Sequence, residues 1–255
     1  MTVAHMAPAA PVQTALHRLA PEAKVAATLA FVISVALVPR GVAWPYAVDL
    51  ALLAALAAWA RAPLSLLARR LAIEVPFVAF VVVLPFAAHG PRVHVLGVGL
   101  AHEGLSAAGE IVAKATLAVL ATGVLGATTP PAAIVAGLGR LRVPALLTGV
   151  AALAIRYLQL VLDDLGRARR ARIARGDDPR WLWQARATAR GAGGLAARSL
   201  ARGERVHIAM LARGFDGRLP VLALAPPATV GAWVAALTAV LPAVAASAVA
   251  AGGLR

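Results

Sequence analysis

The fold depends on the stretch PALLTGVAALAIRYLQLVLDDLGRARRARIAR, residues Pro144–Arg175, which is either a membrane-spanning helix or an amphipathic helix outside the bilayer. It begins as apolar as a membrane span and ends as a run of arginines. At about 100° per residue, one helical face is apolar or aromatic: Leu146, Val150, Leu153, Tyr157 and Val161. The other side is a polar stripe: Arg156, Gln159, Asp163, Arg167 and Arg170. Lipid-spanning helices rarely carry such a stripe, so the pattern predicts one long amphipathic helix against a membrane or a partner.

The rest of the chain has the composition of a membrane protein. Its 255 residues are 61% hydrophobic, and the mean hydropathy is +0.80. A soluble domain is about 45–50% apolar, so the excess predicts lipid as the solvent of the outer surface. The sequence contains no cysteine, which excludes disulfide and thiol chemistry.

Five further apolar runs predict about five transmembrane helices. They are Val25–Val38, Val42–Ala60, Leu71–Ala88, Gly104–Ala127 and Pro220–Ala251. The first run resembles a signal peptide, but Pro39-Arg40-Gly41 follows it in place of a small-residue cleavage site, so we expect a retained helix. The predicted fold class is therefore an all-α integral membrane protein with a cytoplasmic domain of long amphipathic helices.

The net charge of +14 is concentrated between the apolar runs. From Asp163 to Arg218 there are thirteen arginines against six acidic residues. In a soluble protein this excess suggests nucleic acid, but beside apolar runs it is typical of cytoplasmic loops, and we expect no nucleic-acid partner. Arginine-poor and arginine-rich loops alternate, which predicts a cytoplasmic N-terminus. The predicted division is 1–24 cytoplasmic, 25–127 four spans, 128–218 a cytoplasmic helical domain, and 219–255 a final span and C-terminus.

Two segments end in the same tripeptide, Ala174-Arg175-Gly176 and Ala212-Arg213-Gly214. Glycine stops a helix because it adopts a left-handed conformation. An arginine beside that stop is presented at the helix tip, where its planar fork suits a carboxylate on another protein. The tripeptide recurs at Ala189–Gly191 and Ala201–Gly203, so only placement at a helix end distinguishes the first two copies. Three glycines, Gly191, Gly193 and Gly194, predict a weakened start for the second helix.

With these motifs the chain resembles the transmembrane T component of energy-coupling factor transporters, whose signature is two Ala-Arg-Gly motifs that close two cytoplasmic coupling helices. The similar stretches include Gly126–Pro130, Leu138–Pro144, Arg156-Tyr157, Asp163-Asp164 and Glu204–Pro220. The block Ala209–Pro220 looks most like the cobalt-type branch of that family.

The resemblance implies a non-catalytic subunit with no cofactor, embedded in the lipid bilayer of the cell membrane. It implies that two ABC ATPase subunits bind through Arg175 and Arg213 and their flanking alanines and glycines. It also implies that a separate substrate-binding membrane subunit rests on the apolar face from Leu146 to Val161. Cobalt is the favoured cargo, and nickel or a vitamin stays open.

Histidines in one predicted outer loop are candidate ligands for a metal ion. His89, His94 and His102 occur there, near Glu103. Cobalt or nickel can use imidazole ligands, but these spacings match no tight ligand motif. We therefore expect no metal site in this chain.

Paired acids suggest an enzyme of lipid or isoprenoid metabolism as a rival function. Asp163-Asp164 and Asp177-Asp178 lack the DxxxD or DDxxD spacing that places carboxylates for Mg²⁺ and diphosphate, and neighbouring arginines predict local ion pairs instead. The chain also lacks a Gly-x-x-x-x-Gly-Lys-Ser/Thr phosphate loop and a defensible Ser-His-Asp arrangement, so we expect no catalytic residues.

The other rival is a membrane-anchored protein whose basic domain binds anionic lipid or nucleic acid. That function predicts a loss of binding in proportion to any arginine removed, together with strong salt dependence. A coupling role predicts instead that Arg175 and Arg213 matter far more than Arg198 or Arg202.

Overall fold

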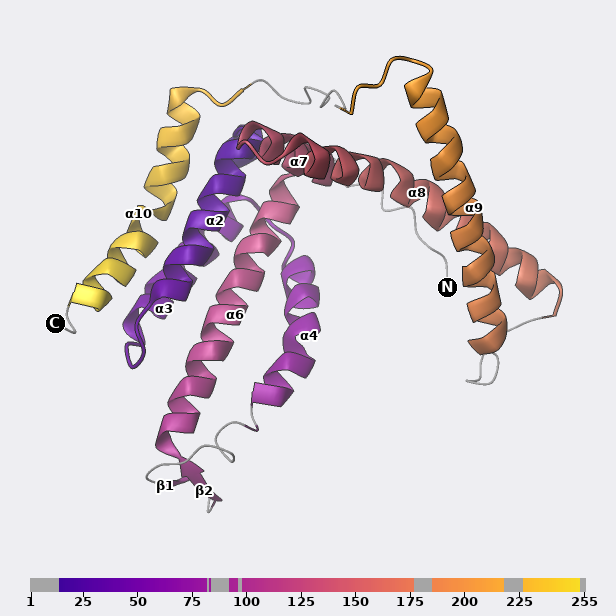
Figure 1. Cartoon of the computed structure of the whole chain (residues 1–255). Coiled ribbons are helices and arrows are strands. Elements are labelled where there is room, and N and C mark those ends of the chain that lie inside the picture. The colour runs from indigo at the N-terminus through magenta and orange to yellow at the C-terminus, as the bar shows by residue number, and fades with distance from the viewer. Residues whose placement is uncertain are drawn as a thin grey trace. The chain divides into compact units, whose positions relative to one another are not determined.

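The computed structural model describes residues 14–81, 83, 92–95, 98–176, 185–217 and 227–252. The chain divides into two compact units, unit 1 (Met1–Gly137 with Leu224–Arg255) and unit 2 (Leu138–Ala223). In chain order the elements are α1 (Ala15–Arg18), α2 (Pro21–Leu37), α3 (Trp44–Trp59), α4 (Leu64–Val81), β1 (Arg92–Val95), β2 (Val98–Ala101), α6 (His102–Thr128), α7 (Pro131–Arg140), α8 (Ala145–Ala174), α9 (Ala185–Leu211) and α10 (Val230–Gly252) (Figure 1). The predicted all-α membrane class is confirmed, with one short hairpin added.

Four helices of unit 1 pack as a ring. Helix α2 packs against α6 and α10, and α3 packs against the same two helices. All four contribute to one buried core, made of Phe31, Val35, Leu53, Leu117, Ala121, Val240 and Ala243. Helix α4 packs against α6, beside this ring. These helices form because their sequences are almost wholly apolar and prolines stand in the first turns of α2 and α3, where a missing N–H costs nothing.

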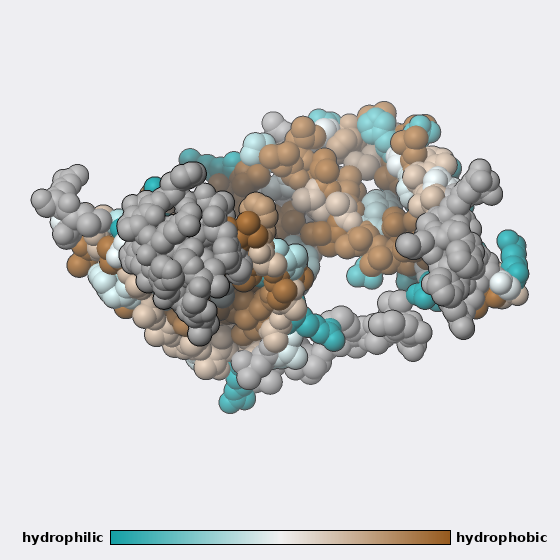
Figure 2. Space-filling model, turned by 90° about the horizontal axis from the view of Figure 1, so that it is seen from below, coloured by the Kyte–Doolittle hydropathy of each residue, from teal (hydrophilic) through white to brown (hydrophobic). Residues whose placement is uncertain are grey.

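Apolar side chains also cover much of the outside. In the space-filling view brown hydrophobic residues make up most of the coloured surface, and teal hydrophilic residues gather in smaller groups (Figure 2). Among the described residues, three helical segments are long and apolar enough to cross a membrane: Gly104–Thr128, Ala145–Ala174 and Val230–Gly252. Trp44–Trp59 is apolar but shorter. The number of spans, about five, therefore stays a prediction.

Polar side chains tie the helices together at both ends of the bundle. At one end Lys24 Nζ donates to the carbonyl oxygen of Thr128 at 3.1 Å, and the backbone N–H of Ala228 donates to Glu22 Oε1 at 2.5 Å. At the other end Lys114 Nζ donates to the Val38 carbonyl oxygen at 2.9 Å. That carbonyl lies at the C-terminus of α2, where helical carbonyl groups lack partners within the helix. The two lysines therefore join the two ends of α2 to α6.

The third bundle helix differs from its prediction. Helix α4 begins at Leu64, whereas the apolar run predicts a start at Leu71. Its added first turns carry charge, but Arg70 Nη1 donates to the Thr122 carbonyl oxygen of α6 at 3.0 Å. One turn later Glu74 accepts from Thr116 Oγ1 at 3.1 Å. Both charged groups hydrogen-bond to α6, so the bundle helix can include them. Hydropathy alone places the start of this helix too late.

The last helix and the predicted outer loop also differ from expectation. Helix α10 begins at Val230, and not at Pro220, because Thr229 Oγ1 accepts a hydrogen bond from the Ala232 N–H and caps the helix there. Residues 218–226 lie outside the described part. In the loop before α6, strands β1 and β2 pair antiparallel, with Val93 opposite Leu100 and Val95 opposite Val98. A hairpin of this length has too little periodic pattern to predict.

A glycine in α7 allows close packing on α2, which a matched pair of substitutions tests. A Cβ added at Gly137 would lie 2.9 Å from the backbone nitrogen of Glu22, whereas one at Gly126 meets only the guanidinium end of Arg70. Backbone cannot move aside as a side-chain end can, so Gly137→Ala should lower the free energy of unfolding by about 1–3 kcal/mol. Gly126→Ala should cost less. Thermal unfolding midpoints in detergent would measure both, and equal midpoints would contradict the packing described.

Candidate functional site

Helix α8 confirms that the stretch predicted at Pro144–Arg175 is one long helix. Because the same segment is long and apolar enough to cross a membrane, its position outside the bilayer stays a prediction. On its predicted contact face, Leu146 and Val150 are 71% and 58% exposed. Farther along the same face, Leu153, Tyr157 and Val161 are half-buried. The predicted polar stripe is exposed at Arg156, Gln159, Asp163, Arg167 and Arg170. Unit 2 therefore presents a bare apolar surface at the start of α8 and a charged surface toward its end.

The two Ala-Arg-Gly motifs occupy equivalent places at helix ends. Arg175 is the C-cap of α8, and Gly176 follows with φ +84°. Arg213 follows α9 in the same way, and Gly214 has φ +80°. Such positive φ values are costly for side chains other than glycine. The sequence prediction that glycine ends both helices is therefore confirmed.

Backbone hydrogen bonds close both helix ends. The Gly176 N–H donates to the Ile173 carbonyl oxygen, and the Gly214 N–H donates to the Leu211 carbonyl oxygen, both at 3.0 Å. After α9, the Phe215 N–H also donates to the Met210 carbonyl oxygen at 3.0 Å, which completes a Schellman motif. All six motif residues are exposed: Ala174, Arg175, Gly176, Ala212, Arg213 and Gly214. A fixed backbone thus holds each arginine exposed at a helix end.

The other two copies of the tripeptide lie inside a helix. Ala189–Gly191 and Ala201–Gly203 both fall within α9, which runs unbroken from Ala185 to Leu211. From Ala185 onward α9 is continuous, and Gly191, Gly193 and Gly194 all lie in it. The weak helix start predicted from these glycines is therefore not seen in the described residues. The guanidinium of Arg172 on α8 lies close to Gly191, at 3.6 Å from a Cβ built there. Packing between the helices thus offsets low helix propensity.

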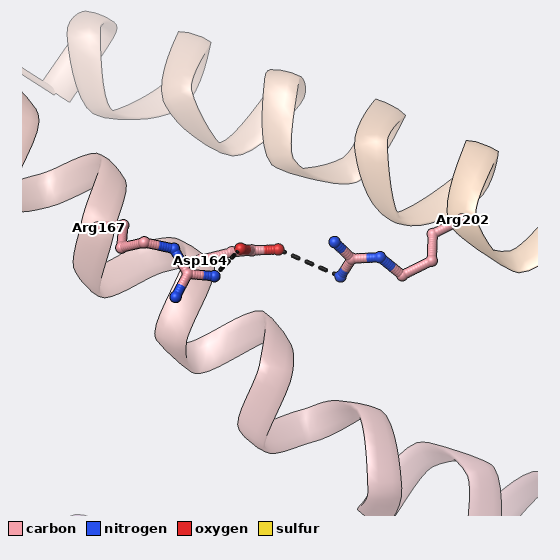
Figure 3. Close-up of polar contacts among 3 residues, drawn as sticks. All are labelled: Asp164, Arg167 and Arg202. Carbon is pink, nitrogen blue, oxygen red and sulfur yellow. Dashed lines mark hydrogen bonds and ion pairs between the residues drawn. The ribbon is translucent and has the colours of Figure 1, made fainter.

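An ion pair joins α8 to α9, and the sequence did not reveal it. Asp164 on α8 accepts from Arg202 Nη1 on α9 at 3.2 Å and also from Arg167, one turn along its own helix (Figure 3). The expectation of local ion pairing by the first aspartate pair is confirmed for Asp164. Arg202, however, joins α9 to α8 through this ion pair. A substitution of Arg202 is therefore not a neutral control for substitutions of Arg175 and Arg213. Arg202 follows Asp164 by 38 residues, and Arg213 follows Arg175 by the same number. This equal spacing is the feature of the sequence from which the ion pair could have been predicted.

The Asp164 carboxylate is held in its charged form. Hydrogen bonding to Arg167, and then to Arg202, lowers the pKa of Asp164 from its ordinary value of 3.8, against an opposing effect of burial. The Asp164 carboxylate lies beyond the apolar first half of α8. A lowered pKa in the folded state means that the pairing stabilises the folded protein above pH 4 and is lost as the pH falls through the lowered pKa. The link between α8 and α9 is therefore intact at neutral pH.

Two contacts show how α8 and α9 meet. Because Asp164 contacts Arg202 and Arg172 lies near Gly191, the helices run antiparallel. Arg175 follows Asp164 by eleven residues, and Arg213 follows Arg202 by eleven. At a rise of about 1.5 Å per residue, each motif arginine lies roughly 16 Å from the crossing, in opposite directions. The two motif arginines therefore lie at the same sequence distance from this ion pair.

A charge swap tests whether this ion pair sets the crossing. Asp164→Arg should place like charges opposite each other and loosen α9 from α8, which makes the α9 backbone more accessible to protease in detergent. Adding Arg202→Asp should restore wild-type resistance, because the reversed pair can form again. Asp163→Arg is the matched control, since Asp163 is exposed on the same helix. Equal sensitivity of the single and double variants would contradict the assignment.

The remaining expectations concern metal and acidic groups. Among the residues that the structure describes, no three histidine, cysteine, aspartate or glutamate side chains come together where they could hold a metal ion. His89, Asp177, Asp178 and Pro179 lie outside the described residues. So do the side chains of His94, His102 and Glu103. The expected absence of a site at the outer-loop histidines is therefore untested.

Apolar helices in a bundle, joined in one chain to a second helical unit, define a helical integral membrane protein. Residues 13–222 match the model of the CbiQ family, described as cobalt transport protein. The chain belongs to this family.

A curated relative gives the same result. The cobalt transport protein CbiQ of Rhodobacter capsulatus is 34% identical over 136 residues, which cover 52% of this chain and 54% of the relative. The chain thus matches about half the length of that protein. The resemblance seen in the sequence is confirmed at the level of the family.

Proposed function

We propose that this chain is the membrane-embedded coupling subunit of an ATP-driven importer, with cobalt as its cargo and nickel as the nearest alternative. Two ABC ATPase subunits dock on the arginine tips, and a separate substrate-binding membrane subunit rests on the apolar face of α8. ATP-driven closure of the ATPases moves the tips, and α8 passes that motion to the substrate subunit. The cargo rests on the family and the relative named above.

The arginine tips carry the proposal. Arg175 and Arg213 are exposed, and each stands at a helix C-terminus whose cap is fixed by a left-handed glycine. A cation there is favoured by the helix dipole, and a guanidinium fork pairs with carboxylates of a partner. The arms on either side of the Asp164–Arg202 pair are equal in residues. Equal arms suit two similar partners, such as a pair of ATPases.

The exposed apolar face supports a second, different partner. Leu146, Leu147 and Val150 lie within one turn and a half of α8, and all are more than half exposed. Clustered apolar exposure of this kind marks an interaction surface. If α8 instead crossed the bilayer, Arg156 and Asp163 would face lipid at a cost of about 2.5–3.5 kcal/mol each. A membrane protein partner on the apolar face would cover the exposed apolar side chains of the first half of α8. It would also leave the charged side chains of the second half away from lipid.

The experiment that tests this function is a pull-down of the tagged chain from native membranes, with mass spectrometry of the partners. We expect two copies of ABC ATPase and a small, very apolar membrane protein. Recovery of the chain alone from several detergents would contradict the proposal. A lipid-binding function is separated by salt, because the attraction of many arginines to an anionic membrane surface is screened as the salt concentration rises from about 50 to about 200 mM. Docking at two fixed tips predicts a weak salt effect.

A further inference from the structure

Two cavities adjoin at the end of the unit 1 bundle where α2 begins. The first, a pocket of about 310 Å³, is lined by His17, Arg18, Thr128, Thr129 and Thr229 together with apolar residues such as Leu19 and Ala133. The second, an apolar cavity of about 110 Å³, reaches inward between the four ring helices and is lined by Phe31, Leu52, Val124, Ala236 and Ala239 among others. Both are lined by Leu19, Lys24 and Thr128. The two cavities therefore meet at these residues, with cationic side chains lining the first and mainly apolar side chains lining the second.

Lys24 stands at the junction and is only 8% exposed. Its ammonium group has three N–H donors, and one is used in the 3.1 Å bond to the Thr128 carbonyl oxygen. Among the described residues no carboxylate pairs with it and no second acceptor is bound to it. A buried charge without a counter-charge is costly, so the site favours an anion. The neighbouring hydroxyl groups and the exposed Arg18 suit a phosphate in particular.

We propose that this site binds one anionic phospholipid, with its phosphate group against Lys24 and Arg18 and part of one acyl chain in the apolar cavity. A free phosphate would occupy only the pocket beside Arg18, whereas a lipid would also place part of an acyl chain in the apolar cavity beyond Lys24. Basic pockets between membrane helices on the cytoplasmic side take anionic headgroups, and the charge pattern predicts that α2 begins on that side. The inference is independent of the docking proposed for unit 2.

The test uses the purified full chain in detergent, titrated with dioleoyl phosphatidylglycerol or dioleoyl phosphatidylcholine and followed by native mass spectrometry and thermal unfolding. We expect phosphatidylglycerol to be retained and to raise the unfolding midpoint, and phosphatidylcholine to do so far less. Lys24→Met and Arg18→Gln should each weaken phosphatidylglycerol binding about fivefold. Lys114→Met is the matched control, because Lys114 bonds backbone carbonyls at the far end of α2 and lines neither cavity.

Two further arms separate lipid from other occupants. Ala239→Phe should fill the apolar cavity and lower phosphatidylglycerol binding while both cations stay in place. Inorganic phosphate alone should leave the midpoint unchanged. An equal response to both lipids, an equal response to inorganic phosphate, or no effect of Ala239→Phe would overturn the proposal. If Lys24→Met fails to fold, the exposed Arg18→Gln and the cavity variant decide the result.

Discussion

Reversing the charge of both motif arginines, with Arg175→Glu and Arg213→Glu, should abolish co-purification of the ATPase subunits and reduce cobalt uptake to background. Each substitution leaves an unpaired carboxylate in place of an arginine that pairs across the interface, a loss of about 2–5 kcal/mol per site. Single variants should each retain one ATPase copy, because the two tips lie on separate arms. The measurement is the ratio of ATPase to tagged chain after pull-down, with uptake followed in the same cells.

Matched arginines on the same helix provide the control for that result. Arg198 and Arg205 are exposed on α9 and stand away from both helix ends. Arg198→Glu with Arg205→Glu changes the net charge by the same amount as the motif pair, so a general electrostatic attraction would respond alike to both. Normal ATPase recovery in the motif variant, or equal loss in the control variant, would contradict tip docking.

Placing charge on the apolar face of α8 should separate the two kinds of partner. Leu146→Glu with Val150→Glu puts two carboxylates where an apolar partner surface is expected. Burying each leucine or valine side chain is worth about 1.5–3 kcal/mol, and an unpaired buried charge adds to that loss. We expect the substrate-binding subunit to be lost, uptake to fall to background, and both ATPases to stay bound.

Another exposed leucine gives the control for the apolar face. Leu200 is 69% exposed, like Leu146, but it lies on α9. Leu200→Glu should leave the substrate subunit bound and uptake near the wild-type level. Retention of the substrate subunit by the α8 variant would remove the role proposed for this face, whereas loss of the ATPases alone would assign the face to them.

Features that depend on local chemistry were predictable from the sequence. Glycine at a helix end adopts a left-handed conformation wherever the helix lies, so Gly176 and Gly214 could be placed as helix stops. The amphipathic period of α8 is equally local. The bundle helices follow from apolar runs, although their starts depend on partners. Hydropathy places the start of α4 too late because it ignores the hydrogen bonds of Arg70 and Glu74 to α6.

Features that depend on residues far apart in the chain were not predictable. Lys24 reads as a charge flanking a span, yet it is buried against Thr128, 104 residues away. Arg202 reads as one member of an arginine stripe, yet it forms an ion pair with Asp164 on α8, 38 residues away. In both cases the residue type is ordinary for its segment, and only the fold selects it.

Site-directed cross-linking shows whether the ATPases contact the two helix ends, and single cysteines can be introduced cleanly because the chain has none of its own. Ala174→Cys and Ala212→Cys place one thiol beside each motif arginine, and Ala189→Cys places one beside the copy inside α9. After labelling with a short photo-cross-linker in native membranes, the account predicts an ABC ATPase adduct from Ala174→Cys and from Ala212→Cys, and none from Ala189→Cys. ATPase adducts from all three positions alike, or from neither helix end, would contradict it.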